Sequence, residues 1–329
     1  MLTSKPLASL SLDLDNKWSY LKTRGDRKWQ SLPSYLDLVV PRVLGLLKTL
    51  DLTITVFVVG QDAALAVHRE PLAAIAAAGH EIGNHSFHHE PWLHRYGEAQ
   101  VESELQRAEE SIERATGRRP VGFRGPGFSL SAVTLEVLAR RRYLYDASTL
   151  PTFLGPLARA YYFWASSLTR EERQQREALY GSFSDGWRSI RPYWWRTPAG
   201  QILEIPVTTM PGVKIPFHAS YVIYLAARAP RLAMAYFETA LALCRWSKSP
   251  PSVLLHPLDF LGGDDTKDLA FFPGMSLPGG RKLELLGEIL QRLCARFAVV
   301  PLEEQARRVA KATTLSVREP VFRHVDGAI

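Results

Sequence analysis

Two acidic residues near the start of the chain stand in what is otherwise an apolar, strand-like segment. The segment "SLSLDLDNKW" carries Asp13 and Asp15. Residues two apart on a strand point to the same face, so the two carboxylates would project together near the carboxyl end of the strand. A buried carboxylate needs a cation or hydrogen-bond donors, because its desolvation is costly. The alternative is that the strand ends at Leu14 and both acids are solvated turn residues beside Asn16.

A histidine-rich segment offers a partner for these acids. "GHEIGNHSFHHEPWLH" contains His80, His85, His88, His89 and His94. Two imidazoles four residues apart lie on one helical face and can bind one divalent metal, and His85 and His89 have this spacing. With a strand-borne aspartate they would form the Asp/His/His set of an open catalytic metal site. We expect His80 to be structural, and His88 and His94 to lie at the solvent or substrate edge.

The elements that must position these residues alternate along the chain. Alternating strand-like and helical segments predict an α/β fold with mostly parallel strands, and such folds build their sites at the carboxyl ends of strands. Residues 34–50 predict a helix that Pro41 kinks or splits. Residues 221–246 predict one long helical stretch. We expect a single catalytic domain at 1–312, with an aromatic-rich insertion at about 150–200 and a tail at 313–329.

Composition excludes several classes of protein. Of the 329 residues, only Cys244 and Cys294 are cysteines, which provides neither a disulfide framework nor a metal motif. The net charge of +7 permits an anionic partner, but the arginines are interleaved with glutamates, so we exclude nucleic acid. The first residues lack the features of a signal peptide and no segment could span a membrane, which predicts a cytoplasmic location.

Taken together, the motifs resemble the polysaccharide deacetylase family, the NodB-homology or carbohydrate esterase family 4 proteins. The resemblance extends roughly from Ser9 to Ala310 and implies a distorted (β/α)7 barrel. Five segments carry it in order: "SLDLDN", "GHEIGNHSFHH", "FRGPGF", "YDAST" and "LLHPLDF".

The resemblance also implies roles for individual residues. Asp13 would be the general base, oriented by an ion pair with Arg124. One divalent metal would be bound, with zinc as the default and cobalt, manganese or nickel as alternatives. Its ligands would be Asp15, His85 and His89.

The same resemblance makes His256 the general acid that protonates the leaving amine. The family's usual aromatic and acidic partner of this histidine is not identifiable here, and the candidate carboxylates are Asp146, Asp185 and Asp259. The residues expected at the substrate are Pro126, Tyr145, Asp146 and Asp259, although Tyr145 and Asp146 could instead close a turn.

The implied reaction is hydrolysis of an N-acetyl or N-formyl group on an amino sugar. An aromatic and basic cluster (Tyr161, Tyr162, Phe163 and Trp164) and the apolar stretch 221–246 are features of helices that lie on anionic membranes, although core packing is the alternative. They suggest the branch of the family that acts on undecaprenyl-phosphate-linked sugars at the cytoplasmic face of the membrane. The alternatives are a deacetylase of soluble or exopolysaccharide N-acetyl sugars and a small-molecule C–N amidase. The complete motif set argues against a catalytically inactive relative.

Overall fold

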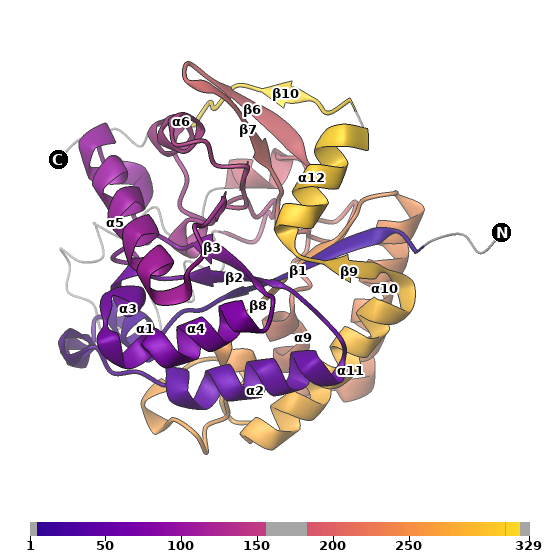
Figure 1. The fold of residues 1–329 in the computed structure, drawn as a ribbon. Coiled ribbons are helices and arrows are strands. Elements are labelled where there is room, and N and C mark those ends of the chain that lie inside the picture. Colours follow the sequence, from indigo (N-terminus) through magenta and orange to yellow (C-terminus); the bar gives the residue numbers. More distant parts are fainter. Residues whose placement is uncertain (1–4, 156–182, 313, 323–329) are drawn as a thin grey trace.

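The computed structural model describes residues 5–155, 183–312 and 314–322, and in this part of the chain ten strands form one sheet (Figure 1). The strand order is β10-β6-β7-β5-β4-β3-β2-β1-β8, with β9 paired to β1. Only β6 and β7 among the described strand pairs are antiparallel. The strands are β1 (Leu7–Asp13), β2 (Thr55–Val58), β3 (Glu81–Asn84), β4 (Gly122–Phe123), β5 (Tyr145–Asp146), β6 (Tyr193–Thr197), β7 (Gly200–Glu204), β8 (Ser252–Leu255), β9 (Ala298–Val300) and β10 (Val317–Arg318).

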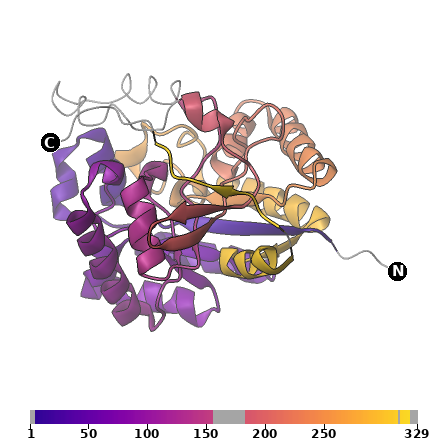
Figure 2. The same ribbon diagram turned by 90° about the horizontal axis from the view of Figure 1, so that it is seen from above.

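Helices follow most of the parallel strands and cover the sheet. Helices α2, α4, α5 and α6 pack against one another in that order, and α9, α10 and α11 form a second group. Figure 2 shows the orange α9 and α10 on the opposite side of the molecule from the purple α5 and α6. The α-helices are α1 (Lys17–Arg24), α2 (Leu36–Thr49), α3 (Gly60–Ala64), α4 (Arg69–Ala77), α5 (Glu98–Thr116), α6 (Ala132–Arg140), α9 (Ala219–Ala226), α10 (Pro230–Trp246), α11 (Gly279–Arg296) and α12 (Leu302–Ala312). The 3-10 helices are η1 (Arg27–Ser31), η2 (Ala66–His68), η3 (Leu93–Arg95), η4 (Pro126–Phe128), η5 (Phe183–Trp187), η6 (Pro257–Asp259) and η7 (Lys267–Leu269).

The expected α/β fold with mostly parallel strands is confirmed. Strands β2 and β8 are buried along their whole length, as is usual for parallel strands that are covered on both faces. Strand pairing does not close the sheet of the described residues into a barrel. The segment after β7 nevertheless contacts β8 through one backbone hydrogen bond. The Thr208 amide donates to the Ser252 carbonyl at 3.0 Å.

Of two helices predicted from the sequence, one stays whole and the other is divided. Helix α2 is not split at Pro41. Pro41 and Asp37, whose carbonyl loses its usual partner, are both exposed. The stretch 221–246 is not one helix: α9 ends at Ala226, and α10 begins at Pro230, which is well suited to the first helical position.

The expected insertion and tail also contain regular structure. Strand β6 lies within the insertion and forms a hairpin with β7, and β10 lies within the tail and pairs with β6. The aromatic cluster at 161–164 lies outside the described residues. None of the helices in the described part of the chain is long and apolar enough to cross a membrane.

Candidate active site

The carboxyl ends of neighbouring parallel strands bring the sequence motifs together. Leu12 of β1 is paired with Leu255 of β8, so Asp13 and His256 follow at adjacent strand ends. In the same way His85 and Arg124 follow the paired residues at the ends of β3 and β4. The residues gathered at this edge are Asp13, Asp15, His85, His89, Arg124 and His256.

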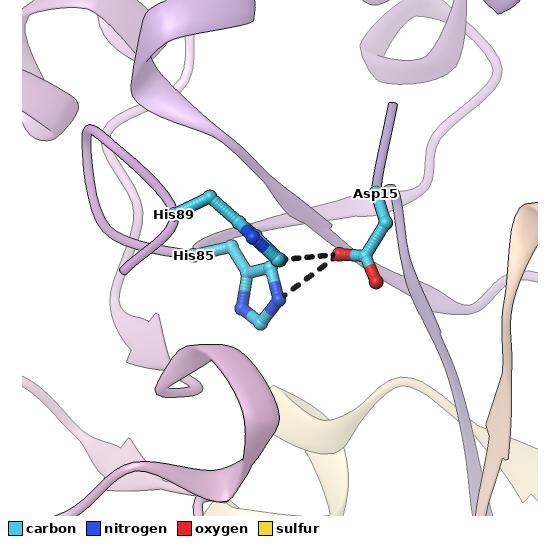
Figure 3. Close-up of side chains that lie close together, drawn as sticks. All are labelled: Asp15, His85 and His89. Atoms are coloured by element: carbon cyan, nitrogen blue, oxygen red, sulfur yellow. Dashed lines mark hydrogen bonds and ion pairs between the residues drawn. The ribbon is translucent and has the colours of Figure 1, made fainter. Parts of the chain in front are cut away.

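Asp15, His85 and His89 converge on one point (Figure 3). The Nε2 atoms of His85 and His89 lie 3.3 Å and 2.9 Å from the same Asp15 Oδ1 atom. All three side chains are buried, and their ligand atoms lie within 4.8 Å of one another. Burial opposes ionisation of Asp15, but the two imidazoles, His89 foremost, hold its pKa well below the ordinary value.

The chemistry of this donor set fits a divalent cation. His85 Nδ1 lies 2.7 Å from the carbonyl oxygen of Arg124, which can only accept, so Nδ1 carries the proton and Nε2 presents a lone pair. An ionised carboxylate and two imidazoles are ligands that zinc and related metals prefer. The residues present therefore suit a metal, and their geometry does not select among the candidate ions.

The two histidines meet on a loop and not on a helix, contrary to the expectation of a shared helical face. Residues 85–89 follow β3 without helical structure, and Ser86 and His89 adopt left-handed backbone conformations with φ of 60° and 51°. In this loop conformation the two imidazoles meet with ring centroids 5.1 Å apart. The four-residue spacing correctly predicted that the two imidazoles lie close together. They do so on a loop, and not on the helix that this spacing suggested.

Asp13 is held by Arg124 in a buried ion pair. Arg124 Nη1 donates to Asp13 Oδ1 at 2.7 Å and to Ser11 Oγ at 2.9 Å, while Nε donates to the carbonyl of Ala147 at 2.9 Å. Arg124 is completely buried and its guanidinium also stacks on the ring of Phe57. A charge this deeply buried is stable only when paired, so the orientation of Asp13 is tightly constrained.

His256 follows β8 and is half-buried. Its Nδ1 lies 3.1 Å from Ser220 Oγ, and its backbone amide donates to Asp259 Oδ2 at 2.8 Å. Of the three carboxylates considered, Asp259 is therefore the one that contacts this residue. Asp146 instead bonds to Ser148, and Asp185 pairs with Arg188.

The remaining residues expected at the substrate are placed deeper in the protein. Pro126 is buried at the start of η4, two residues after Arg124. Tyr145 is fully buried, and its hydroxyl donates to Glu81 Oε1 at 2.6 Å, which is a packing role. Asp146 is also fully buried, beside Glu204 on the neighbouring strand β7.

The other histidines of the histidine-rich segment have partners away from the metal ligands. His80 Nδ1 accepts from the Ile54 amide, which agrees with a structural role. His88 Nδ1 pairs with Glu104, and His94 Nδ1 lies 2.9 Å from Ser129 Oγ.

Sequence reasoning missed three residues near the site: Glu204, His218 and Ser220. Glu204 interrupts the apolar segment "QILEIP" and could have been found by the signal that singled out Asp13, a charge within a buried strand. Its carboxyl accepts from Thr149 Oγ1 at 2.6 Å and from Trp195 Nε1 at 2.9 Å. His218 and Ser220 had no local signal, because their relation to His256 exists only in the folded chain.

Comparison with known sequences points to one family. Residues 32–145 match the family model of polysaccharide deacetylases. The match supports a polysaccharide deacetylase domain. The matched range contains His85, His89 and Arg124, whereas Asp13, Asp15 and His256 of the candidate active site lie outside it.

One curated relative of this chain is a peptidoglycan deacetylase of Helicobacter pylori, which is 32% identical over 117 residues. The aligned segment covers 36% of this chain and 39% of the relative. The chain thus matches well under half the length of that protein.

Solved structures share the fold over nearly the whole chain. A presumed polysaccharide deacetylase from Mycobacterium smegmatis superimposes with a TM-score of 0.63 and 23% identity, covering 98% of this chain and 97% of its own. PuuE allantoinase superimposes with a TM-score of 0.55 and 17% identity, covering 95% and 94% of the two chains. At these identities the likeness establishes the fold alone.

Proposed function

We propose that this protein is a metal-dependent hydrolase that removes an N-acetyl or N-formyl group from an amino sugar. The observation that carries the proposal is the buried pair of Asp13 and Arg124 beside the convergent Asp15, His85 and His89. The match to polysaccharide deacetylases supports the reaction class. The name of the Helicobacter relative supports an N-acylated glycan as the substrate class.

The proposed roles follow from the position of each side chain. Asp15, His85 and His89 would hold a divalent cation, which would supply Lewis-acid chemistry by polarising a carbonyl oxygen and lowering the pKa of water. Asp13, fixed by Arg124, accepts the proton of the water that attacks the amide carbon. His256, from the adjacent strand end, donates a proton to the leaving amine nitrogen. Ser220 holds the His256 ring through Nδ1, which leaves Nε2 for this transfer.

We further propose that the substrate is linked to a polyprenyl phosphate and is met at an anionic membrane surface on the cytoplasmic side. Support comes from the end of α9, the start of α10 and the connection between them, where Tyr224, Arg228, Arg231 and Leu232 are exposed. The Arg228 guanidinium lies 4.5 Å from the centre of the Tyr224 ring, and Leu232 is 60% exposed. Aromatic and basic side chains together favour the interface of an anionic bilayer. We call these four residues the α9–α10 surface.

We also propose that residues 1–312 act as one catalytic domain. The N-terminal β1 pairs with β8 and β9 from the C-terminal third of the chain, so the sheet joins both ends of this range.

The test is release of acetate and formate by the purified full chain from three kinds of substrate. These are N-acetylglucosamine oligomers, polyprenyl-phosphate-linked N-acyl amino sugars in vesicles, and simple N-acyl amines without a sugar. We expect release from the sugars, loss of release after chelation, and recovery when zinc, cobalt, manganese or nickel is added back. Release that survives complete metal removal, or that occurs only from the sugar-free amines, would contradict the proposal.

A further inference from the structure

A second imidazole lies beside His256. His218 precedes the first residue of α9 and is only 6% exposed. Its ring centroid lies 5.7 Å from that of His256, and its ring meets Tyr221 edge to face at 4.5 Å. Neither the sequence motifs nor the proposed catalytic roles use this residue.

One nitrogen of the buried His218 ring lacks a hydrogen bond. Within the described residues its buried Nδ1 has no hydrogen-bond partner. Burial, and then the neighbouring His256 and Arg124, place the pKa of His218 well below its ordinary value, so the ring is neutral. Leaving a buried polar atom such as this Nδ1 unpaired is costly, and a ligand hydroxyl beside the neutral ring would reduce that cost.

The first turn of α9 and His218, which directly precedes it, supply three residues that contact His256 or one another. Ser220 contacts His256 Nδ1, and His218 lies against the His256 ring. Tyr221, which contacts His218, keeps 40% of its surface exposed. This turn therefore borders the place where the proposed general acid meets the leaving amine.

We propose that the first turn of α9 recognises the sugar that carries the amide, with His218 hydrogen-bonding a ring hydroxyl and Tyr221 packing on the apolar face of the ring. The inference deepens the proposed function and rests on it. A neutral imidazole offers one donor and one acceptor, which matches a hydroxyl group. A phosphate or carboxylate would instead be recognised by charged donors such as arginine. His218 is thus a sugar-contacting residue and not a second general acid.

The experiment measures sugar binding and hydrolysis separately in the full chain. Wild type, His218→Phe, His218→Gln and the distant control Trp246→Phe are titrated calorimetrically with N-acetylglucosamine, N-acetylgalactosamine and the N-acetylglucosamine tetramer. We expect His218→Phe to weaken binding about 3- to 10-fold, the usual effect of losing one neutral hydrogen bond. His218→Gln keeps a donor and an acceptor, so its sugar affinity should fall less than that of His218→Phe. The control Trp246→Phe should bind the sugars as wild type does. In hydrolysis, KM should rise while kcat changes little.

A measurement on the wild type keeps the inference testable if both variants misfold. The 15N resonances of the His218 ring should shift when the bound sugar is added, while those of His68, which directly precedes α4, should not. Equal binding by wild type and both variants, unshifted His218 resonances, or a wild type that binds none of the three sugars would each overturn the inference. Sugar binding that depends on His218 without acetate or formate release would contradict the proposed hydrolysis and leave the sugar contact standing. Hydrolysis with binding independent of His218 would contradict the sugar contact alone.

Discussion

Arg124 connects the candidate metal ligands to the proposed base through two different parts of the same residue. Its carbonyl oxygen lies 2.7 Å from Nδ1 of His85, and its guanidinium lies 2.7 Å from the carboxylate of Asp13. The backbone of Arg124 thus sets the tautomer of a ligand, while its side chain sets the orientation of the base. A substitution at this position changes the second role and leaves the first intact.

Replacing Arg124 with lysine should therefore reduce turnover and spare metal binding. Lysine cannot donate to Asp13, Ser11 and Ala147 at once, so Asp13 should lose its fixed orientation. Misplacing a reacting group by about 1 Å can cost about 100-fold in rate, and we expect a decrease of that order. Steady-state kinetics and elemental analysis of the same preparation check both parts. Full turnover in the lysine variant, or loss of the metal, would contradict the division of roles.

The metal ligands can be tested with a matched histidine. The His85→Ala and His89→Ala variants should bind the metal more weakly than wild type. The loss of metal affinity should exceed the 10- to 100-fold that is typical when a residue that only supports a ligand is replaced. His88→Ala is the control, because His88 lies in the same loop but pairs with Glu104. Plasma mass spectrometry of the purified proteins measures the metal content. Full occupancy in His85→Ala would show that the ligand assignment is wrong.

The two aspartates should separate into different roles. Asp13→Asn should keep the metal and lower turnover by about 10²–10⁴-fold, as for loss of a general base. Asp15→Asn should instead lower metal affinity, since a neutral amide is a poorer ligand than a carboxylate. Kinetics at saturating zinc and a zinc titration distinguish the two effects. The reverse pattern would mean that base and ligand are exchanged.

Glu204 should make stability fall as pH rises. Burial, and then the neighbouring Asp146, raise the pKa of Glu204 well above its ordinary value. The unfolded chain loses this proton near pH 4.3 (about the model-peptide value), while the folded protein keeps it. The stabilisation is therefore complete below the unfolded pKa and is lost as pH rises through the folded pKa.

Glu204→Gln stays uncharged and removes this dependence. The quantity to compare is the unfolding free energy of Glu204→Gln minus that of wild type. Between pH 5 and the folded pKa, this difference should increase by up to about 1.4 kcal/mol for each pH unit. Urea denaturation at several pH values measures the difference, with the exposed Glu284→Gln as control. A gap between Glu204→Gln and wild type that does not change with pH would contradict the protonated state.

Membrane binding should depend on the α9–α10 surface and on ionic strength. Replacing Tyr224 and Leu232 with serine should weaken binding to vesicles that contain anionic lipid, and added salt should weaken the wild type because charge attraction is screened. Val67→Ser is the control, since Val67 is 68% exposed in η2, away from this surface. Vesicle co-sedimentation is the measurement. Unchanged binding by the double variant would remove the support for a lipid-linked substrate and leave a deacetylase of soluble sugars.

The sequence by itself identified the residues that we propose carry the chemistry, and it determined the class of fold. Alternation of apolar segments is a local property, and it was sufficient to predict a mostly parallel α/β sheet. Asp13 and Asp15 were recognisable because a charge in an apolar strand needs a partner, and His85 and His89 because of their spacing. These signals depend on residue type and on separation along the chain, and both can be read from a sequence without a structure.

Only the tertiary structure decided how these residues meet. The left-handed conformations of Ser86 and His89 bring the imidazoles together on a loop, a geometry that spacing alone cannot distinguish from a helix. Ser220 reaches His256 across 36 positions of sequence, and His218 lies against the same ring. Such contacts arise because α9 packs against the end of β8. They depend on long-range packing, for which a single sequence carries no local signal, and so the residues around the proposed general acid became visible only in the folded chain.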